Sequence, residues 1–274
     1  MHWTEWGDAR NPRVLICVHG VSRVSRDFDT LARELSRHYR VICPDIVGRG
    51  RSDWLTDPLH YNVPQYVQDC AMLIAHLKAD TVHWVGTSMG GLIGMGLAAS
   101  QPDAIQRLVL NDVGPVIKGA ALTRIGDYLG ADISFKTFEE GAAYIKMLSA
   151  PFGEHSDAQW RSLSEHMLVQ REETGARVWR LHYDPRIGDN FKLVARVTPS
   201  GTDMYLWNVY DAIKCPTLAI RGALSDLLSR ETHTEMALRG PKATLAEIPR
   251  VGHAPTLMQP DQIAVVRDFL LMSA

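Results

Sequence analysis

The stretch VHWVGTSMGGLIGMG, residues 82–96, contains a single serine surrounded by small residues. The apolar run before it, 81–86, predicts a buried strand, and the longer run after it, 89–100, predicts a helix. Ser88 therefore stands at a strand-to-helix junction, in the pattern G-x-S-x-G. In this context the pattern predicts a sharp turn that presents the serine hydroxyl above the edge of a sheet as a nucleophile.

The glycines of this turn have a steric explanation. The turn forces Ser88 into a strained backbone conformation, and a side chain at Gly86 or Gly90 would strike the neighbouring strand or helix. The same turn leaves the Met89 amide free at the helix N-terminus, where the helix dipole favours negative charge. The turn after the run ICVHG offers a second amide, that of Val21. We expect these two N–H groups to form an oxyanion hole.

Other short apolar runs repeat along the chain and alternate with helical patterns. Runs that are apolar at consecutive positions suit strands covered on both faces, as in a parallel sheet. The alternation predicts an α/β fold with a mostly parallel central sheet and helices on both faces, and residues 2–6 are expected to pair at one edge. The strand runs are residues 13–20, 40–45, 81–86, 107–115, 216–222 and 243–249, and the helical patterns are 25–38, 63–78 and 260–272.

The strand pattern fades between residues 115 and 214, where helical patterns follow one another at 121–130, 138–153, 157–170 and 205–214. We expect residues 115–214 to form a helical cap, or lid, inserted in a core made of 1–114 and 215–274. The alternative is that these helices pack on a face of the sheet. A minority of the large apolar side chains of the cap is expected to face Ser88. The candidates are Leu122, Ile125, Tyr128, Leu129, Phe135, Phe138, Tyr144, Met147, Leu148, Phe152, Trp160 and Trp207.

A serine nucleophile needs a base and an acid that orients the base. Of the eleven histidines, only His253, in IPRVGHAP, follows a late strand in a glycine turn, which places it at the same sheet edge as Ser88. For the acid, we favour Asp226 in GALSD over Asp112 in LVLNDVGP. The spacing strand-G-x-x-x-D and the chain order Ser, Asp, His match the common arrangement. His19, at the end of an earlier strand, is expected to hold its turn by hydrogen bonding.

Three charged residues lie near these turns. Asp45 is expected to brace the glycine turn at 48–50. Arg23 and Arg26 follow the predicted oxyanion turn, and their simplest role is to begin a solvated helix. The sharper hypothesis is that one of them meets an anionic group of the substrate.

Composition excludes several classes of function. The 274 residues are 46% hydrophobic, enough for a large core, and the net charge of -2 favours neither nucleic acid nor an anionic membrane as partner. No apolar run approaches the ~20 residues of a membrane span, and no secretory signal is recognisable, so a cytoplasmic location is expected. Four single cysteines and the absence of zinc-ligand spacing predict neither a disulfide framework nor a metal site. The fingerprint-like G-x-G-x-x-A at 94–99 falls inside a helix, so no nucleotide cofactor is expected.

These motifs together resemble the α/β-hydrolase superfamily along nearly the whole chain. They are HG at His19-Gly20, DxxGxGxS at Asp45, Gly48, Gly50 and Ser52, GTSMGG at 86–91, GALSD at 222–226 and GHAP at 252–255. The resemblance implies a serine-esterase cycle, with Ser88, His253 and Asp226 as triad and no cofactor. We expect the substrate to be a small or medium carboxylic ester or lactone.

Two alternatives stay open. GTSMGG is similar to the carbon–carbon hydrolases of aromatic ring-cleavage pathways, although the loop HGVSRVS and the Ala254 after the base depart from their pattern. A non-catalytic ligand-binding member of the fold is the second alternative.

Overall fold

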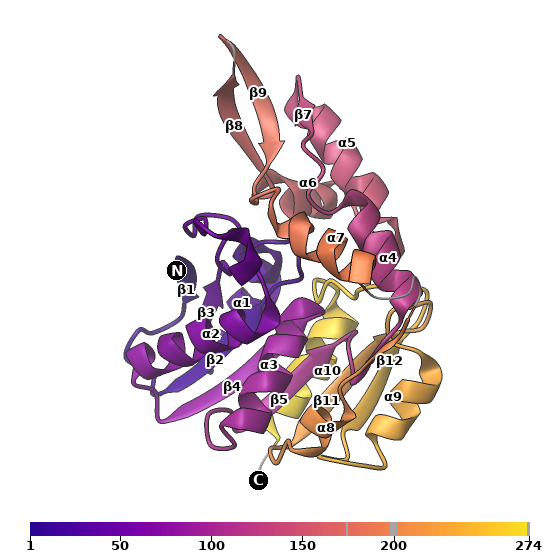
Figure 1. The fold of residues 1–274 in the computed structure, drawn as a ribbon. Coiled ribbons are helices and arrows are strands. Elements are labelled where there is room, and N and C mark those ends of the chain that lie inside the picture. The colour runs from indigo at the N-terminus through magenta and orange to yellow at the C-terminus, as the bar shows by residue number, and fades with distance from the viewer. Residues whose placement is uncertain (174, 198–201, 273–274) are drawn as a thin grey trace.

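The computed structural model describes residues 1–173, 175–197 and 202–272 of the chain. Its main sheet contains β1 (Trp3–Trp6), β2 (Arg13–Val18), β3 (Arg40–Pro44), β4 (Thr81–Thr87), β5 (Arg107–Asn111), β11 (Thr217–Gly222) and β12 (Thr244–Ile248). The seven strands lie in the order β1-β3-β2-β4-β5-β11-β12 (Figure 1). Only β1 is antiparallel to its neighbour. The predicted fold class is therefore confirmed, and β1 is the expected edge strand.

Both faces of the sheet are buried. In β2, Val14 and Ile16 belong to one hydrophobic cluster, and Leu15 and Cys17 belong to another. Because strand side chains alternate between the two faces, a run that is apolar at every position supplies both clusters. The first cluster packs with α2 (Val63–Leu77), α3 (Met89–Ser100), α8 (Trp207–Asp211) and α9 (Arg230–Met236). The second packs with η1 (Ser25–Phe28), α1 (Asp29–Leu35) and α10 (Pro260–Leu271).

The glycines inside α3 serve close packing, as predicted. A Cβ at Gly94 would lie 2.5 Å from the indole nitrogen of Trp84, and one at Gly96 would lie 2.8 Å from Val67 of α2. Both contacts are too short for a side chain, so these glycines let α3 approach the sheet and its neighbouring helix. They follow the turn rather than form it, which agrees with the interpretation that they are not a dinucleotide fingerprint.

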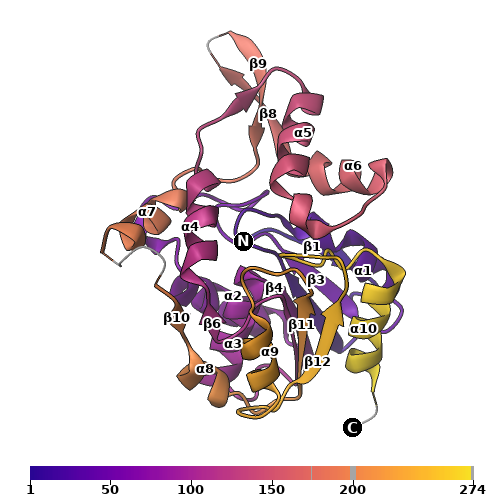
Figure 2. The same cartoon turned by 90° about the vertical axis from the view of Figure 1, so that its right-hand side faces the viewer.

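The segment that follows β5 and precedes β11 in sequence folds mainly into a separate layer above the sheet (Figures 1 and 2). It has a small hydrophobic cluster of its own, formed by Phe135, Ile145, Met167 and Leu168 together with Val24 of the core. Its elements are β6 (Val116–Ile117), α4 (Gly119–Tyr128), β7 (Ser134–Phe135), α5 (Phe138–Leu148), η3 (Ala150–Phe152), α6 (Asp157–Glu165), β8 (Leu168–Glu173), β9 (Ala176–Leu181), α7 (Ile187–Val197) and β10 (Met204–Tyr205), with α8 at its end. We call residues 115–214 the inserted segment.

The inserted segment is less helical than predicted. The helix expected over 157–170 ends at Glu165, and the chain then forms the antiparallel hairpin β8–β9, to which β7 pairs. Gly175 turns this hairpin with φ +80°, a conformation that glycine adopts without steric cost. The helical interpretation of this stretch was wrong because cross-strand pairing, not local propensity, stabilises it.

Two expectations from composition can be compared with the described residues as a whole. None of the described helices combines the length and the apolar character needed to cross a membrane. The four cysteines are all buried and form no disulfide, as predicted for small apolar side chains.

Candidate active site

Ser88 lies at the turn between β4 and α3 with φ 53° and ψ -115°. This left-handed region is strained for a residue with a side chain. A Cβ at Gly86 would lie 2.2 Å from the Gly90 carbonyl oxygen, and one at Gly90 would lie 2.0 Å from the Val18 carbonyl oxygen. Neither position tolerates a side chain, so the steric explanation of the G-x-S-x-G glycines is confirmed.

The ring of His253 connects Ser88 to a buried carboxylate. His253 Nε2 lies 3.0 Å from Ser88 Oγ, and His253 Nδ1 lies 2.8 Å from Asp112 Oδ2. His253 is on the loop after β12, so the sheet brings together three residues that are far apart in sequence. With the proton on Nδ1 donated to Asp112, Nε2 is the acceptor for the serine hydroxyl. This is the arrangement that activates a serine for nucleophilic attack.

Asp112 is fully buried and directly follows β5, with φ 55°. Its Oδ1 accepts a hydrogen bond from the Gly222 amide at 2.8 Å, and its Oδ2 accepts one from the Ser225 hydroxyl at 2.7 Å. The Ser225 oxygen itself accepts from two backbone amides, so its proton is directed to Asp112. These donors fix the orientation of the carboxylate.

Asp226 does not reach His253, so the prediction that it orients the base is wrong. Its carboxylate pairs with Arg124 of the inserted segment through two hydrogen bonds of 2.8 and 3.0 Å, and its side chain is 49% exposed. The turn after β11 directs Ser225 toward Asp112 and the next residue, Asp226, outward. The alternative acid in the sequence, Asp112, occupies the place instead.

The register of the sheet explains the position of Asp112. The parallel pair β4 and β5 has Thr87 opposite Asn111. The next residues, Ser88 and Asp112, therefore leave the sheet at the same edge and level. The Ser88 amide also donates to the Asn111 carbonyl at 3.0 Å.

Two backbone amides remain available near Ser88. Within the described ranges, the N–H groups of Val21 and Met89 donate no hydrogen bond to a protein group, and Met89 is the first residue of α3. Val21 lines the same cleft as Ser88, next to Gly20, where an added Cβ would lie 3.8 Å from the Ser88 Cβ. The role of these amides as an oxyanion hole stays a prediction.

Arg49 supports both predicted oxyanion residues, and the sequence reasoning missed it. Its side chain is completely buried, and its Nε donates to the Val21 carbonyl at 2.9 Å. Nη1 donates to the Tyr66 hydroxyl, and Nη2 lies 3.6 Å from the Met89 sulfur. The position of Arg49 between the glycines of the DxxGxGxS motif is the only signal the sequence offered.

His19 and Asp45 have the structural roles expected of them. His19 Nδ1 donates to the Gly20 carbonyl at 2.7 Å, and its Nε2 accepts from the Ile46 amide at 3.0 Å. Complete burial lowers the pKa of His19 to about 4, so the ring stays neutral and holds the turn. Asp45 accepts from the Arg51 amide, and its carboxyl group lies where a side chain at position 50 would be.

A cleft leads to Ser88, and both the core and the inserted segment line it. From the core come the turn at residues 20–23, Thr87, His253 and Ala254. From the predicted list of apolar candidates, the inserted segment contributes Ile125, Tyr128, Leu148 and Phe152. The remaining wall is also mainly apolar, with Ile145, Met167 and Leu181.

The two arginines proposed to meet an anionic group differ in position. Arg23 lines the cleft, but it is 8% exposed and forms a bidentate ion pair with Asp27. Arg26 pairs with Asp29 and is absent from the lining. Arg124, which was not considered, lines the cleft as well.

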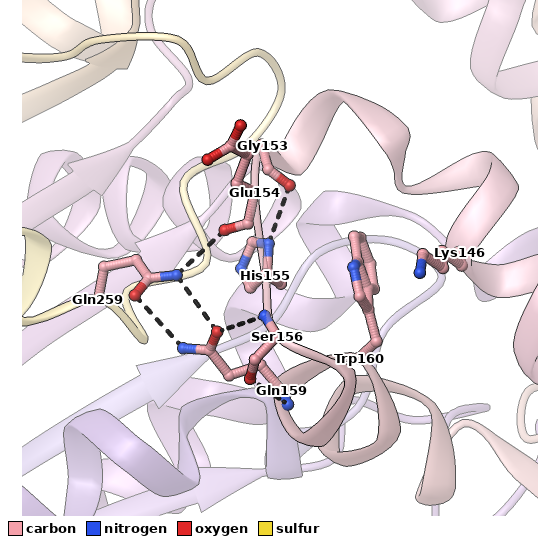
Figure 3. A pocket seen from close by; sticks show the side chains of 8 residues that line it. All are labelled: Lys146, Gly153, Glu154, His155, Ser156, Gln159, Trp160 and Gln259. Atoms are coloured by element: carbon pink, nitrogen blue, oxygen red, sulfur yellow. Dashed lines mark hydrogen bonds between the residues drawn. The ribbon is translucent and has the colours of Figure 1, made fainter.

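A second hollow lies at the junction of the inserted segment and the loop before α10 (Figure 3). Gln159 of α6 and Gln259 are hydrogen bonded across it, and Gln259 also donates to the Glu154 carbonyl (Figure 3). The Ser156 hydroxyl accepts from the Gln159 amide as the cap of α6, and both ring nitrogens of His155 are engaged. The polar groups of this hollow therefore connect two parts of the chain.

Comparison with known proteins identifies the family of this chain. The sequence model of the alpha/beta hydrolase family matches residues 15–266, and the chain therefore belongs to that family. A 3-hydroxybutyrate-oligomer hydrolase of Cupriavidus necator is 50% identical over 269 residues, which are 98% of this chain and 92% of that protein.

Two solved structures are similar over nearly their whole length. An alpha/beta hydrolase from Novosphingobium aromaticivorans has a TM-score of 0.84 and 37% identity, covering 98% of this chain and 93% of that one. A putative hydrolase from Rickettsia typhi has a TM-score of 0.89 and 32% identity, covering 99% and 91%. Together these relatives confirm the predicted class: the chain is an ester-cleaving hydrolase of this fold.

Proposed function

We propose that this protein hydrolyses short linear oligoesters of 3-hydroxybutyrate, with Ser88 as nucleophile, His253 as general base and Asp112 as the acid that orients it. The observation that carries the catalytic part is the hydrogen-bond chain from Ser88 Oγ through His253 to Asp112, with distances of 3.0 and 2.8 Å. The substrate part is supported by the 50% identity to a 3-hydroxybutyrate-oligomer hydrolase over 98% of this chain.

The reaction proceeds through an acyl-enzyme. Ser88 Oγ attacks the ester carbonyl carbon while His253 Nε2 takes the hydroxyl proton, and the amides of Val21 and Met89 stabilise the oxyanion. The tetrahedral species collapses, the C–O bond breaks, and His253 returns the proton to the leaving alkoxide. Water, deprotonated by His253, then attacks the acyl group and releases the acid and free Ser88. Asp112 keeps the imidazole in the required tautomer throughout.

Residues 115–214 act as the cap of this site in our proposal. In support, more than half of the residues around the cleft come from this segment, and most of them are apolar. An apolar roof excludes water and strengthens the interaction of the oxyanion with its donors. It also suits a substrate with methyl-bearing repeating units and neutral ester groups.

The test measures release of 3-hydroxybutyrate from its linear dimer and trimer, compared with 4-nitrophenyl butyrate, a lactone and a ring-fission diketone. We expect the oligomers to have the highest kcat/KM. Ser88→Ala should lower turnover on the order of 10⁶-fold and abolish labelling by a fluorophosphonate, because the nucleophile is lost. Faster cleavage of the diketone would favour a carbon–carbon hydrolase instead, and labelling without turnover of any ester would favour a binding protein.

A further inference from the structure

The charged side chains that line the cleft are two arginines, Arg23 and Arg124. Among the described residues, no aspartate or glutamate belongs to the lining. Asp112 lies behind His253 and is completely buried. An anionic group that enters the cleft therefore meets no carboxylate of the lining itself, and the acidic side chains nearest to it are the partners of the two arginines.

Arg23 is poorly placed to bind that group. Its Nε and Nη2 donate to Asp27 at 2.7 Å, and Nη2 also donates to the Leu163 carbonyl at 2.9 Å. The guanidinium lies over the ring of Phe152, with 5.7 Å between its carbon and the ring centroid. These contacts fix the side chain between the core and the inserted segment, so Arg23 serves the architecture of the wall.

Arg124 is placed differently. It lies on α4, and its only carboxylate partner is Asp226, which binds Nε and Nη2. Its Nη1 has no hydrogen-bond partner within residues 1–173, 175–197 and 202–272. Both side chains of the pair are partly exposed, at 39% and 49%. Solvent reaches both partners of this pair, so a competing carboxylate can exchange with Asp226 at the guanidinium.

We propose that Arg124 binds the free carboxylate of the terminal unit of the substrate, and of the hydroxy-acid product, with Asp226 as its displaceable counter-ion. The inference rests on the proposed oligoester activity, because a linear 3-hydroxybutyrate oligomer carries one carboxylate and is otherwise neutral. A guanidinium suits this task because its planar fork binds a carboxylate through two parallel hydrogen bonds. In the absence of substrate, Asp226 neutralises the guanidinium through Nε and Nη2.

The assignment predicts selectivity for acid-terminated chains. A chain whose terminal carboxyl is converted to an amide has the same length and the same esters, but it lacks the charge. Hydrogen bonds to charged groups are strong enough that we expect about a tenfold or larger preference for the acid. In this proposal Arg124 takes the role that the sharper of the two hypotheses gave to Arg23 or Arg26.

The test uses inhibition, so that it does not depend on turnover of oligomers. With 4-nitrophenyl butyrate as reporter, the inhibition constants of 3-hydroxybutyrate and of 3-hydroxybutyramide are compared in the wild type. The ratio of the two constants, taken within each variant, cancels any change in reporter activity. The variants are Arg124→Met, Arg124→Lys and Asp226→Asn, with Arg26→Ala as a control, since Arg26 is outside the cleft lining.

We expect the anion to bind about tenfold or more tightly than the amide in the wild type and in Arg26→Ala. The ratio should fall to near one in Arg124→Met and stay above one in Arg124→Lys, which keeps the charge and loses the fork. In Asp226→Asn the anion should bind more tightly, because the competing carboxylate is gone. An unchanged ratio in Arg124→Met would overturn the assignment. If Arg124→Met does not fold, Arg124→Gln replaces it, and an unchanged ratio in that variant would overturn the assignment. Loss of anion preference in Asp226→Asn would overturn the role of Asp226 as a displaceable counter-ion.

Two outcomes, measured on the same protein, distinguish a failure of this inference from a failure of the proposed function. If the trimer is not cleaved while the anion preference and its dependence on Arg124 hold, the oligoester function fails and the carboxylate site stands. If the trimer and its amide-capped form are cleaved equally well, and Arg124→Met leaves both unchanged, the oligoester function stands and the carboxylate site fails.

Discussion

Replacing Asp112 by asparagine tests the assignment of the acid most directly. The substitution keeps the size of the side chain and the acceptor for the Gly222 amide at Oδ1. At the Oδ2 position, however, an NH₂ group would face the Ser225 hydroxyl and His253 Nδ1, which are both donors in the present structure. The imidazole can relieve this conflict only by moving its proton to Nε2.

The size of the effect follows from that tautomer. With its proton on Nε2, His253 can no longer accept the proton of Ser88, which lies 3.0 Å away. We expect kcat to fall about 10⁴-fold, which corresponds to about 5.5 kcal/mol of transition-state stabilisation. The free energy of unfolding should fall by only about 1–3 kcal/mol, the usual cost of leaving a buried hydroxyl without its acceptor.

The assay measures kcat for a neutral ester, 4-nitrophenyl butyrate, and urea unfolding of the same variants. Asp226→Asn is the matched control, because it removes an exposed ion pair worth about 0–1 kcal/mol and should leave kcat for this neutral ester within about twofold. Ser225→Ala should give an intermediate loss, roughly tenfold, because it removes one of the donors that fix the carboxylate. The reverse ranking, with Asp226→Asn inactive and Asp112→Asn active, would refute the reasoning.

Three further perturbations test other parts of the site. Arg49→Met removes the donors to the Val21 carbonyl and the Met89 sulfur. We expect a roughly 10- to 100-fold lower kcat with little change in KM. An unchanged kcat would exclude a role for Arg49 in positioning the oxyanion donors. Phe152→Ala widens the cleft from the inserted segment, so the profile of kcat/KM against acyl length should shift toward longer 4-nitrophenyl esters, and an unchanged profile would place the acyl pocket in the core. Burial lowers the pKa of His19 to about 4, whereas the imidazole of the unfolded chain is protonated below about pH 6.5. The free energy of unfolding therefore falls as the pH drops from about 6.5 toward 4, and His19 contributes a loss of about 2 kcal/mol at about pH 5. Urea unfolding at pH 7 and pH 5 measures this loss, which should be smaller in His19→Asn.

The sequence by itself determined the sheet and predicted Ser88 and His253 as nucleophile and base. Strands that are apolar at every position occur only where both faces are covered, so the runs at 13–20, 81–86 and 107–115 specified a parallel sheet without any knowledge of contacts. The turn at Ser88 was also predictable from the sequence. Glycine is required at 86 and 90, because backbone atoms lie closer to these positions than any side chain permits. His253 could be selected because a glycine turn after a late parallel strand places its histidine at the same sheet edge as Ser88.

Only the tertiary structure decided which carboxylate serves that histidine. Asp112 and Asp226 follow two neighbouring parallel strands, β5 and β11. Both therefore emerge at the same edge, and the sequence spacing could not distinguish them. The choice depends on the direction in which each turn points its side chains. The turn after β11 directs Ser225 inward and the next side chain, Asp226, outward to Arg124.

The inserted segment shows the same limit. Its hairpin β8–β9 and the ion pair of Arg124 bring together residues that are distant in sequence. Their proximity depends on how the layer packs over the core, and local propensity carries no information about that packing. The sequence thus determined the chemistry that its short-range patterns encode: a strained serine, a sheet edge and a base. The acid, the support of the oxyanion loop by Arg49 and the charge at the cleft were decided by long-range packing, because each depends on the direction of a side chain relative to an element distant in sequence.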